Sequence, residues 1–181
     1  MTVRESQAQY IPRYKYKDYE KWDGRWELIS GHPYAMTPTP IYNHQIVSSN
    51  IHLQLMEKLK DCERCRAILP VDWIIDDENV VEPDNMVICY KPKGKFLTKP
   101  PAIIFEILSP STAVKDKEIK FHLYRSQKVK YYIIVDIIRQ NADVYKFTGK
   151  SYKKIISAGS ETVHFDLGSC KFDFDFSSIW V

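Results

Sequence analysis

Two stretches of the chain are apolar at nearly every position, which is typical of strands buried on both faces. They cover residues 102–108 and 131–136, and such runs belong to the central strands of a covered sheet. Apolar and turn-forming residues in shorter patterns predict further strands. These cover residues 26–30, 34–37, 65–75, 85–90, 143–147, 152–156 and 162–165.

Helical periodicity is clearest between residues 41 and 60, where apolar residues recur at spacings of three and four. Asn43 is the expected start signal of this helix. Its predicted apolar face consists of Ile46, Ile51, Leu53, Leu55, Met56 and Leu59.

A second long helix is predicted to begin in the segment Ser109-Pro110-Ser111-Thr112, whose hydroxyl groups suit the free amides of a first helical turn. It should run to about Gln127, and a short helix is expected within residues 14–22. Strands and helices in this order predict an α/β or α+β sheet covered by helices.

Length and composition are those of one compact domain spanning residues 1–181. Apolar residues make up 44% of the chain, enough for a core, and the net charge of +3 is mild. A surface that coats nucleic acid is usually more basic, so any nucleic-acid site should be a local groove. The first six residues lack the apolar core of a signal peptide, and no apolar run spans a membrane. These features predict a soluble, cytoplasmic protein.

The four cysteines are Cys62, Cys65, Cys89 and Cys170. Without a secretory signal, free thiols are expected rather than disulfides. Cys62 and Cys65 form a CxxC pair, but neither a second pair nor a histidine at zinc-finger spacing accompanies it. Neither a zinc site nor a redox pair is therefore favoured.

Glu106 is a carboxylate in the middle of an apolar strand and the first candidate for chemistry. Burying an ionised carboxylate is costly unless a cation or hydrogen-bond donors face it. Asp84 opens a strand directly after Pro83, and this strand should neighbour the one that carries Glu106. Two adjacent carboxylates repel unless a cation lies between them, and Mg²⁺ prefers such oxygen ligands. The alternatives are a structural ion pair at Glu106 and a simple turn at Asp84.

Two lysines on the following helix are candidates to complete this site. At about 100° per residue, Lys117 and Lys120 fall on the same face as Tyr124, whereas Lys115 falls on the opposite side. Either Lys117 or Lys120 could hold a water or a phosphate oxygen beside the carboxylates. In the alternative interpretation both extend past the core to solvent. Asp116 precedes Lys120 by four residues, the spacing at which helical side chains pair.

Several motifs together resemble the Uma family of predicted restriction endonucleases, in the PD-(D/E)XK nuclease superfamily. They follow the family's order over residues 16–144, and the Glu-Ile-Leu-Ser-Pro-Ser-Thr segment at residues 106–112 is the most specific. The other matching segments are Trp26-Glu27-Leu28-Ile29-Ser30-Gly31, His44-Gln45, Glu82-Pro83-Asp84, Asp116 to Lys120 to Tyr124, and Tyr132-Ile133-Ile134-Val135-Asp136.

The resemblance implies a restriction-endonuclease-like fold, a mixed central β-sheet flanked by helices with additional antiparallel strands. It implies that Asp84, Glu106 and the backbone carbonyl of Ile107 ligate Mg²⁺, for which Mn²⁺ can substitute. The family's catalytic lysine is displaced from the strand to the helix. Lys120 matches that displaced position best, and Lys117 is the second choice.

Two further positions match the family, and three depart from it. Glu27 is expected to be a further metal ligand or an exposed strand acid, and His44 a capping or core hydrogen-bonding residue rather than a catalytic one. Where the family commonly has a glycine, a glutamate and an aromatic residue, this chain has Lys128, Tyr131 and Ile133. These changes concern packing or dimer contacts more than the metal site.

The functional hypothesis is a Mg²⁺-dependent endonuclease that hydrolyses DNA phosphodiester bonds, with DNA as partner and no small-molecule cofactor or membrane. A homodimer, common in the superfamily, stays open. The basic loop at residues 91–95 is either a phosphate contact near the site or a solvated turn. The alternative functions are a catalytically inactive nucleic-acid-binding module on the same fold and a fold whose charges form only a structural ion-pair cluster.

Overall fold

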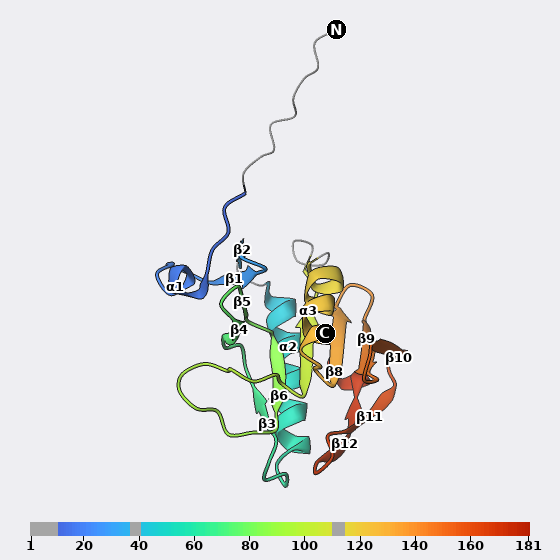
Figure 1. The fold of residues 1–181 in the computed structure, drawn as a ribbon. Helices are drawn as coiled ribbons and strands as arrows, with labels where there is room; N and C mark the ends of the chain where they lie inside the picture. Colours follow the sequence, from blue (N-terminus) through green and yellow to red (C-terminus); the bar gives the residue numbers. More distant parts are fainter. Residues whose placement is uncertain (1–10, 37–40, 110–114) are drawn as a thin grey trace.

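The computed structural model describes residues 11–36, 41–109 and 115–181 (Figure 1). Strands dominate this part of the chain, and no helix in it is long and apolar enough to cross a membrane. In chain order the elements are α1 (Tyr16–Tyr19), β1 (Trp26–Ile29), β2 (His32–Ala35), α2 (Tyr42–Lys58), β3 (Arg66–Ile68), β4 (Trp73–Asp76), β5 (Asn79–Val81), β6 (Asn85–Ile88), β7 (Ile103–Ile107), the π-helix η1 (Lys115–Lys120), α3 (Phe121–Ser126), β8 (Tyr131–Asp136), β9 (Asn141–Phe147), β10 (Tyr152–Ala158), β11 (Thr162–Asp166), β12 (Lys171–Asp175) and the 3₁₀-helix η2 (Phe176–Ser178).

The central sheet has the strand order β10-β9-β8-β7-β6-β3, and it is mixed because β7 and β8 are parallel while the other pairs are antiparallel. Every residue of β6 and β7 is buried, as are the first five of β8. The two continuous apolar runs are therefore central strands, as predicted. A four-stranded sheet, β2-β1-β5-β4, and the hairpin β11-β12 complete the strand structure.

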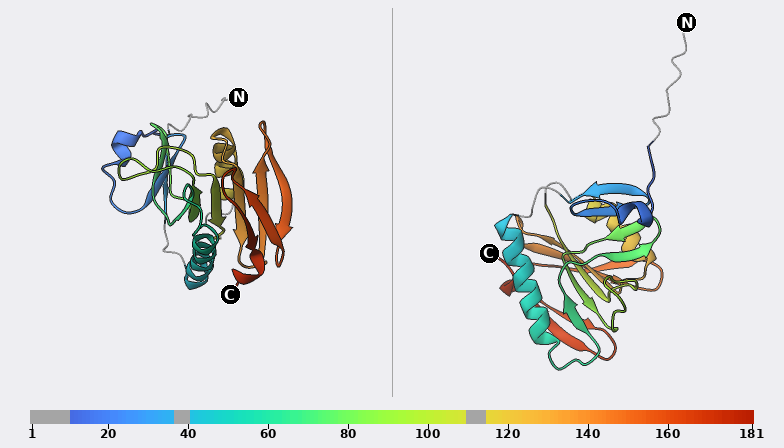
Figure 2. Two further views of the ribbon diagram at one scale, coloured as in Figure 1. Left: turned by 90° about the horizontal axis from the view of Figure 1, so that it is seen from below. Right: turned by 90° about the vertical axis from the view of Figure 1, so that its left-hand side faces the viewer.

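Different elements cover the two faces of the central sheet (Figure 2). Val47, Ile51 and Leu55 of α2 belong to the core on one face, where phenylalanines of the β11-β12 hairpin also pack. Tyr124 of α3 and Trp73 of β4 belong to the core on the other face. The expected helix-flanked mixed sheet is thus confirmed, and the side of β7 that carries Glu106 faces α3.

The helix predicted at residues 41–60 is present as α2, but half of its predicted apolar face is wrong. Ile46, Leu53 and Met56 are exposed, with 69% of Leu53 accessible to solvent. The buried face also contains His44 and Ser48, which a count of apolar positions does not detect. The helix begins at Tyr42 with Ile41 as its N-cap, so the expected start at Asn43 is also wrong.

Ser48 is buried because it meets Asn85, a polar residue of β6. Ser48 Oγ donates to Asn85 Oδ1 at 3.0 Å, and Asn85 Nδ2 donates to the Ser48 carbonyl at 3.2 Å. Ser48 and Asn85 both lie within the interior, where an unpaired polar group would be costly. This pair fixes α2 against the strand that starts one residue after Asp84.

The single strand predicted at residues 65–75 is wrong, because the structure divides it between two sheets. β3 pairs with β6 in the central sheet, whereas β4 pairs with β5 in the four-stranded sheet. Pro70 lies between them and cannot donate to a strand ladder.

The strand predicted at residues 34–37 begins earlier, at His32, because Ser30 and Gly31 both have positive φ and form the hairpin turn. Thr37 lies outside the described residues.

The cysteines are paired in the structure, so the prediction of free thiols is wrong. Disulfides join Cys62 to Cys170 and Cys65 to Cys89, and the described chain holds no free cysteine. Cys170 precedes β12, a strand that the hydrophobic pattern did not predict.

The second predicted helix appears as η1 followed by α3, which ends at Ser126 near the expected end. Residues 110–114 lie outside the described part, so its predicted start is not described.

The amide of Lys128 donates to the Arg125 carbonyl, and that of Val129 to the Tyr124 carbonyl. This is a Schellman C-cap, and Lys128 has φ of +58° there. A glycine would adopt this conformation without a steric penalty.

We therefore expect Lys128→Gly to stabilise the protein by about 1 kcal/mol, because it removes the left-handed strain of a residue that carries a Cβ. Urea denaturation monitored by circular dichroism measures the change. Gln127→Gly is the matched control. Gln127 has φ of −82° in the right-handed region, so glycine there should destabilise instead. A destabilised Lys128→Gly variant would contradict the strain argument.

Candidate metal and phosphate site

Asp84 and Glu106 lie next to each other across the β6–β7 ladder. The antiparallel register pairs Asn85 with Phe105, so Asp84 and Glu106 are the next opposed pair and point to the same side of the sheet. The amide of Ile107 donates to Asp84 Oδ2 at 2.8 Å, which ties the two strand ends together. The structure thus brings together the two carboxylates that the sequence analysis selected.

Lys120 reaches the same place from η1. Its ammonium nitrogen is 2.9 Å from Glu106 Oε1, 2.7 Å from Glu27 Oε1 and 3.5 Å from Asp116 Oδ1, and only 2% of its surface is exposed. Tyr124 donates its hydroxyl to Glu106 Oε1 at 2.7 Å. The predicted pairing of Asp116 with Lys120 is confirmed, and Lys120 does not extend to solvent.

The other two lysines exchange the places that the helical wheel gave them. Lys117 is exposed, so its expected position on the buried face is wrong. Lys115, expected on the opposite side, instead contacts Glu27 Oε2 at 2.5 Å. The reason is that residues 115–120 form a π-helix, whose wider i→i+5 turns do not follow the α-helical angle. Tyr124 was counted only as an apolar residue, so its role as a donor was also missed.

Glu27 is completely buried on β1, so the expectation of an exposed strand acid is wrong. Oε2 accepts from Lys115, while Oε1 accepts from Lys120 and from the amide of Glu82. Burial raises the pKa of Glu27, but the charges of Lys120 and Lys115 outweigh it and lower the pKa overall. Its geometry is that of a residue that holds two lysines in place, and we assign it no metal.

Negative charge exceeds positive charge in this cluster. Among the described residues it contains four carboxylates and two ammonium groups, a formal excess of two negative charges. Burial raises the pKa of Glu106 well above its ordinary value, Lys120 opposes the shift, and the charges of Asp116, Asp84 and Glu27 add to it. Lys120 alone therefore does not neutralise Glu106, unlike an isolated ion pair.

The free carboxylate oxygens suit a divalent cation. Within the described residues, no protein donor reaches Glu106 Oε2 or Asp84 Oδ1, whereas the other oxygen of each group is occupied. Mg²⁺ is commonly held by one or two carboxylates and keeps several waters. The donor set and the charge excess both fit such an ion.

His44, in the first turn of α2, lies beside Asp84 and caps no helix end. Its Nε2 is 3.4 Å from Asp84 Oδ2. Burial lowers the pKa of His44, but the hydrogen bond and charge of Asp84 outweigh it and raise the pKa overall, with the backbone of Ile107 contributing. Of the two expected roles, core hydrogen bonding fits and helix capping does not.

The basic loop at residues 91–95 lies away from the carboxylates. It follows the end of β6, whereas Asp84 precedes its start, and four strand residues span about 13 Å. The loop projects from the opposite end of the β6–β7 hairpin (Figure 1), and its residues are exposed. The solvated-loop interpretation holds, and the expected phosphate contact near the site is wrong.

Comparisons with known proteins agree with this fold. The model of the Uma2 family, described as "Putative restriction endonuclease", matches residues 14–167. Uncharacterized protein slr1290 of Synechocystis is 28% identical over 153 residues, 79% of each chain. Uncharacterized protein sll1609 of the same organism is 34% identical over 82 residues, 42% of this chain and 46% of the relative. A crystal structure titled as a putative nuclease belonging to DUF820, from Anabaena variabilis, superposes with a TM-score of 0.75 at 15% identity, covering 91% of this chain and 96% of that one.

We expect Glu27→Gln to lower the free energy of unfolding by about 3 kcal/mol at neutral pH, because it leaves two lysines short of a buried partner. The folded-state pKa of Glu27 is lowered. Its contribution is therefore present above the unfolded-state pKa, and it disappears as pH falls through the folded-state pKa. Urea denaturation at neutral and acidic pH measures the loss of stability and its pH dependence.

Glu78→Gln is the matched control, since Glu78 pairs with Arg13 at the surface and should change stability by less than about 1 kcal/mol. Equal effects of the two variants would contradict a positioning role for Glu27.

Proposed function

Because the chain belongs to the Uma2 family, whose description is "Putative restriction endonuclease", we propose that it is a divalent-metal-dependent endonuclease acting on DNA. The observation that carries this proposal is the buried cluster around Glu106, which sets four carboxyl groups against two ammonium groups. A divalent cation would supply the missing charge, and a phosphodiester would approach next to it.

Each residue of the cluster has its own task in this proposal. Asp84 and Glu106 would hold Mg²⁺, or Mn²⁺ in its place, through the oxygens that have no protein donor, with the carbonyl of Ile107 as a third ligand. The ion would stabilise charge on the phosphate and make a water molecule more acidic.

Lys120 would bind either that water or a non-bridging phosphate oxygen. Its positive charge would there stabilise the negative charge that develops on the phosphate in the transition state. Its ammonium group has three hydrogens to donate. Glu27 and Glu106 lie 2.7 and 2.9 Å from its nitrogen and Asp116 lies farther away, at 3.5 Å, so one hydrogen would be left for the water or the phosphate. Glu27 would act through Lys120, because its Oε1 lies 2.7 Å from the ammonium nitrogen and fixes the position of that group. Tyr124 orients Glu106 by donating to Oε1, which leaves Oε2 for the ion.

We expect purified protein to nick or linearise plasmid DNA with Mg²⁺ and not with EDTA. Asp84→Asn and Glu106→Gln should each lower the cleavage rate by at least about a hundredfold, since each removes a ligand of the ion. Lys117→Ala is the matched control for Lys120→Ala. Lys117 is exposed and should retain activity, while Lys120→Ala should lose about a hundredfold or more.

Unchanged cleavage by Asp84→Asn or Glu106→Gln would contradict the assignment of the site. Metal-independent DNA binding by the native protein, with no cleavage over hours, would instead support the inactive binding module.

The raised pKa of Glu106 would make the proposed metal binding pH-dependent. An ion that ligates Glu106 must displace its proton, so Mn²⁺ affinity should rise with pH as the carboxyl deprotonates. Isothermal titration in two buffers of different ionisation enthalpy measures the proton released on binding. Glu106→Gln has no such proton and should bind more weakly without releasing one. Binding to the native protein that neither changes with pH nor releases protons would contradict Glu106 as a ligand.

A further inference from the structure

The four cysteines of the chain meet at one place although they come from three separate parts of the fold. Cys62 and Cys65 lie in the connection between α2 and β3, Cys89 directly follows β6, and Cys170 directly precedes β12. The sulfur atoms of Cys62, Cys65 and Cys170 all lie within 4.8 Å of one another. Cys89 joins this group through its bond to Cys65.

The strand register explains why Cys65 and Cys89 are adjacent. β3 and β6 are antiparallel and pair Arg66 with Ile88, so Cys65 and Cys89 are the next opposed positions, on the same side of the sheet. Cys170 arrives from the β11-β12 hairpin, which packs on that face of the sheet through Phe165, Phe172 and Phe174. The cluster is therefore a product of the tertiary structure and not of one local motif.

We propose that the reduced protein binds one Zn²⁺ through the four thiolates of Cys62, Cys65, Cys89 and Cys170. Structural zinc sites are closed tetrahedra of four ligands, and Cys₄ is one of their standard ligand sets. The CxxC pair supplies two ligands at the shortest usual spacing. The fold supplies the second pair, which the sequence alone does not place beside the first.

The local geometry of the CxxC segment supports thiolate chemistry. The amide of Cys65 donates to Cys62 Sγ at 3.3 Å, and a hydrogen bond to sulfur favours its charged form. Cys65 and Cys170 are buried, as suits a closed site.

The two disulfides are the oxidised form of the same cluster. Two equivalents of a dithiol reductant would transfer four electrons and four protons to the two disulfides, giving four thiols and two oxidised reductant molecules. Zn²⁺ then displaces the four thiol protons as the sulfurs become ligands. In both forms the cluster joins the α2–β3 connection, the end of β6 and the β11-β12 hairpin.

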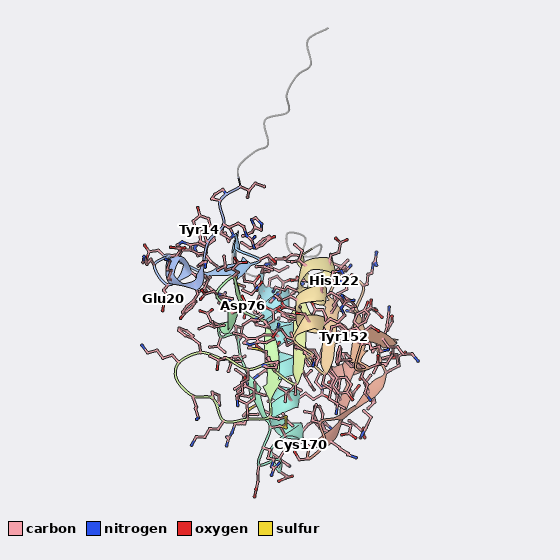
Figure 3. The ribbon with its side chains drawn as sticks, in the orientation of Figure 1. Tyr14, Glu20, Asp76, His122, Tyr152 and Cys170 are labelled. Carbon is pink, nitrogen blue, oxygen red and sulfur yellow. A yellow bond between two sulfur atoms is a disulfide. The ribbon has the colours of Figure 1, made fainter. Side chains whose placement is uncertain are left out.

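This cluster is separate from the carboxylate site. Asp84 precedes β6 and Cys89 follows it, so the two are about 17 Å apart at strand rise. Figure 3 shows Cys170 at the end of the molecule away from His122 of α3. The zinc proposal does not rest on the proposed nuclease activity.

The test uses the full chain purified under reducing conditions, with metal content measured by inductively coupled plasma mass spectrometry. We expect one zinc per chain, lost on treatment with the thiol oxidant diamide. Replacement by Co²⁺ should give the visible absorption bands of a tetrahedral thiolate complex, a measurement on the native protein that needs no variant. Cys89→Ser and Cys170→Ser should each lose most of the zinc and the cobalt bands.

Asp84→Asn is the matched control, because it should lose DNA cleavage and keep the thiolate-bound zinc. Cleavage can thus fail while zinc binding stands, or the reverse. Reduced native protein that binds neither zinc nor cobalt through thiolates, or that contains iron instead, would overturn the proposal. So would cobalt bands that persist unchanged in both serine variants.

Discussion

The ammonium group of Lys120 is the interaction on which this end of the molecule depends. It lies in the interior and contacts carboxylates from three elements, Glu27 of β1, Glu106 of β7 and Asp116 of its own helix. Burial lowers the pKa of Lys120, but the charges of Glu106 and Glu27 outweigh it and raise the pKa well above its ordinary value. The lysine is therefore charged in the folded state, and it links the four-stranded sheet, the central sheet and η1.

The two main partners of Lys120, Glu27 and Glu106, differ in how far neighbouring groups stabilise their negative charge. Glu27 accepts from two lysines, which lower its pKa against the effect of burial and so stabilise its charged form. Glu106 shares Lys120, faces other carboxylates and has a raised pKa. The divalent cation of the proposed function would relieve this repulsion, because it would add positive charge beside Glu106.

β6 connects the two candidate sites of the protein. Its register with β7 sets Asp84 opposite Glu106 at one end, and its register with β3 sets Cys89 opposite Cys65 at the other. Asn85, between them, is fixed to α2 through Ser48. A slip of one residue along β6 would turn both Asp84 and Cys89 to the wrong face, so this short buried strand determines the geometry of both ends.

The sequence by itself determined the central strands and the two carboxylates. Continuous apolar runs show burial on both faces, and a charged residue inside such a run is conspicuous because its burial is costly. Helical periodicity left Lys117 and Lys120 both open, and the resemblance to the Uma family favoured Lys120. Only the tertiary structure decided that Lys115 rather than Lys117 turns inward, that Glu27 binds lysines, and that four cysteines converge. Helical pitch, strand pairing and contacts between distant segments are set by packing across the whole core, and a local pattern of residues does not contain that information.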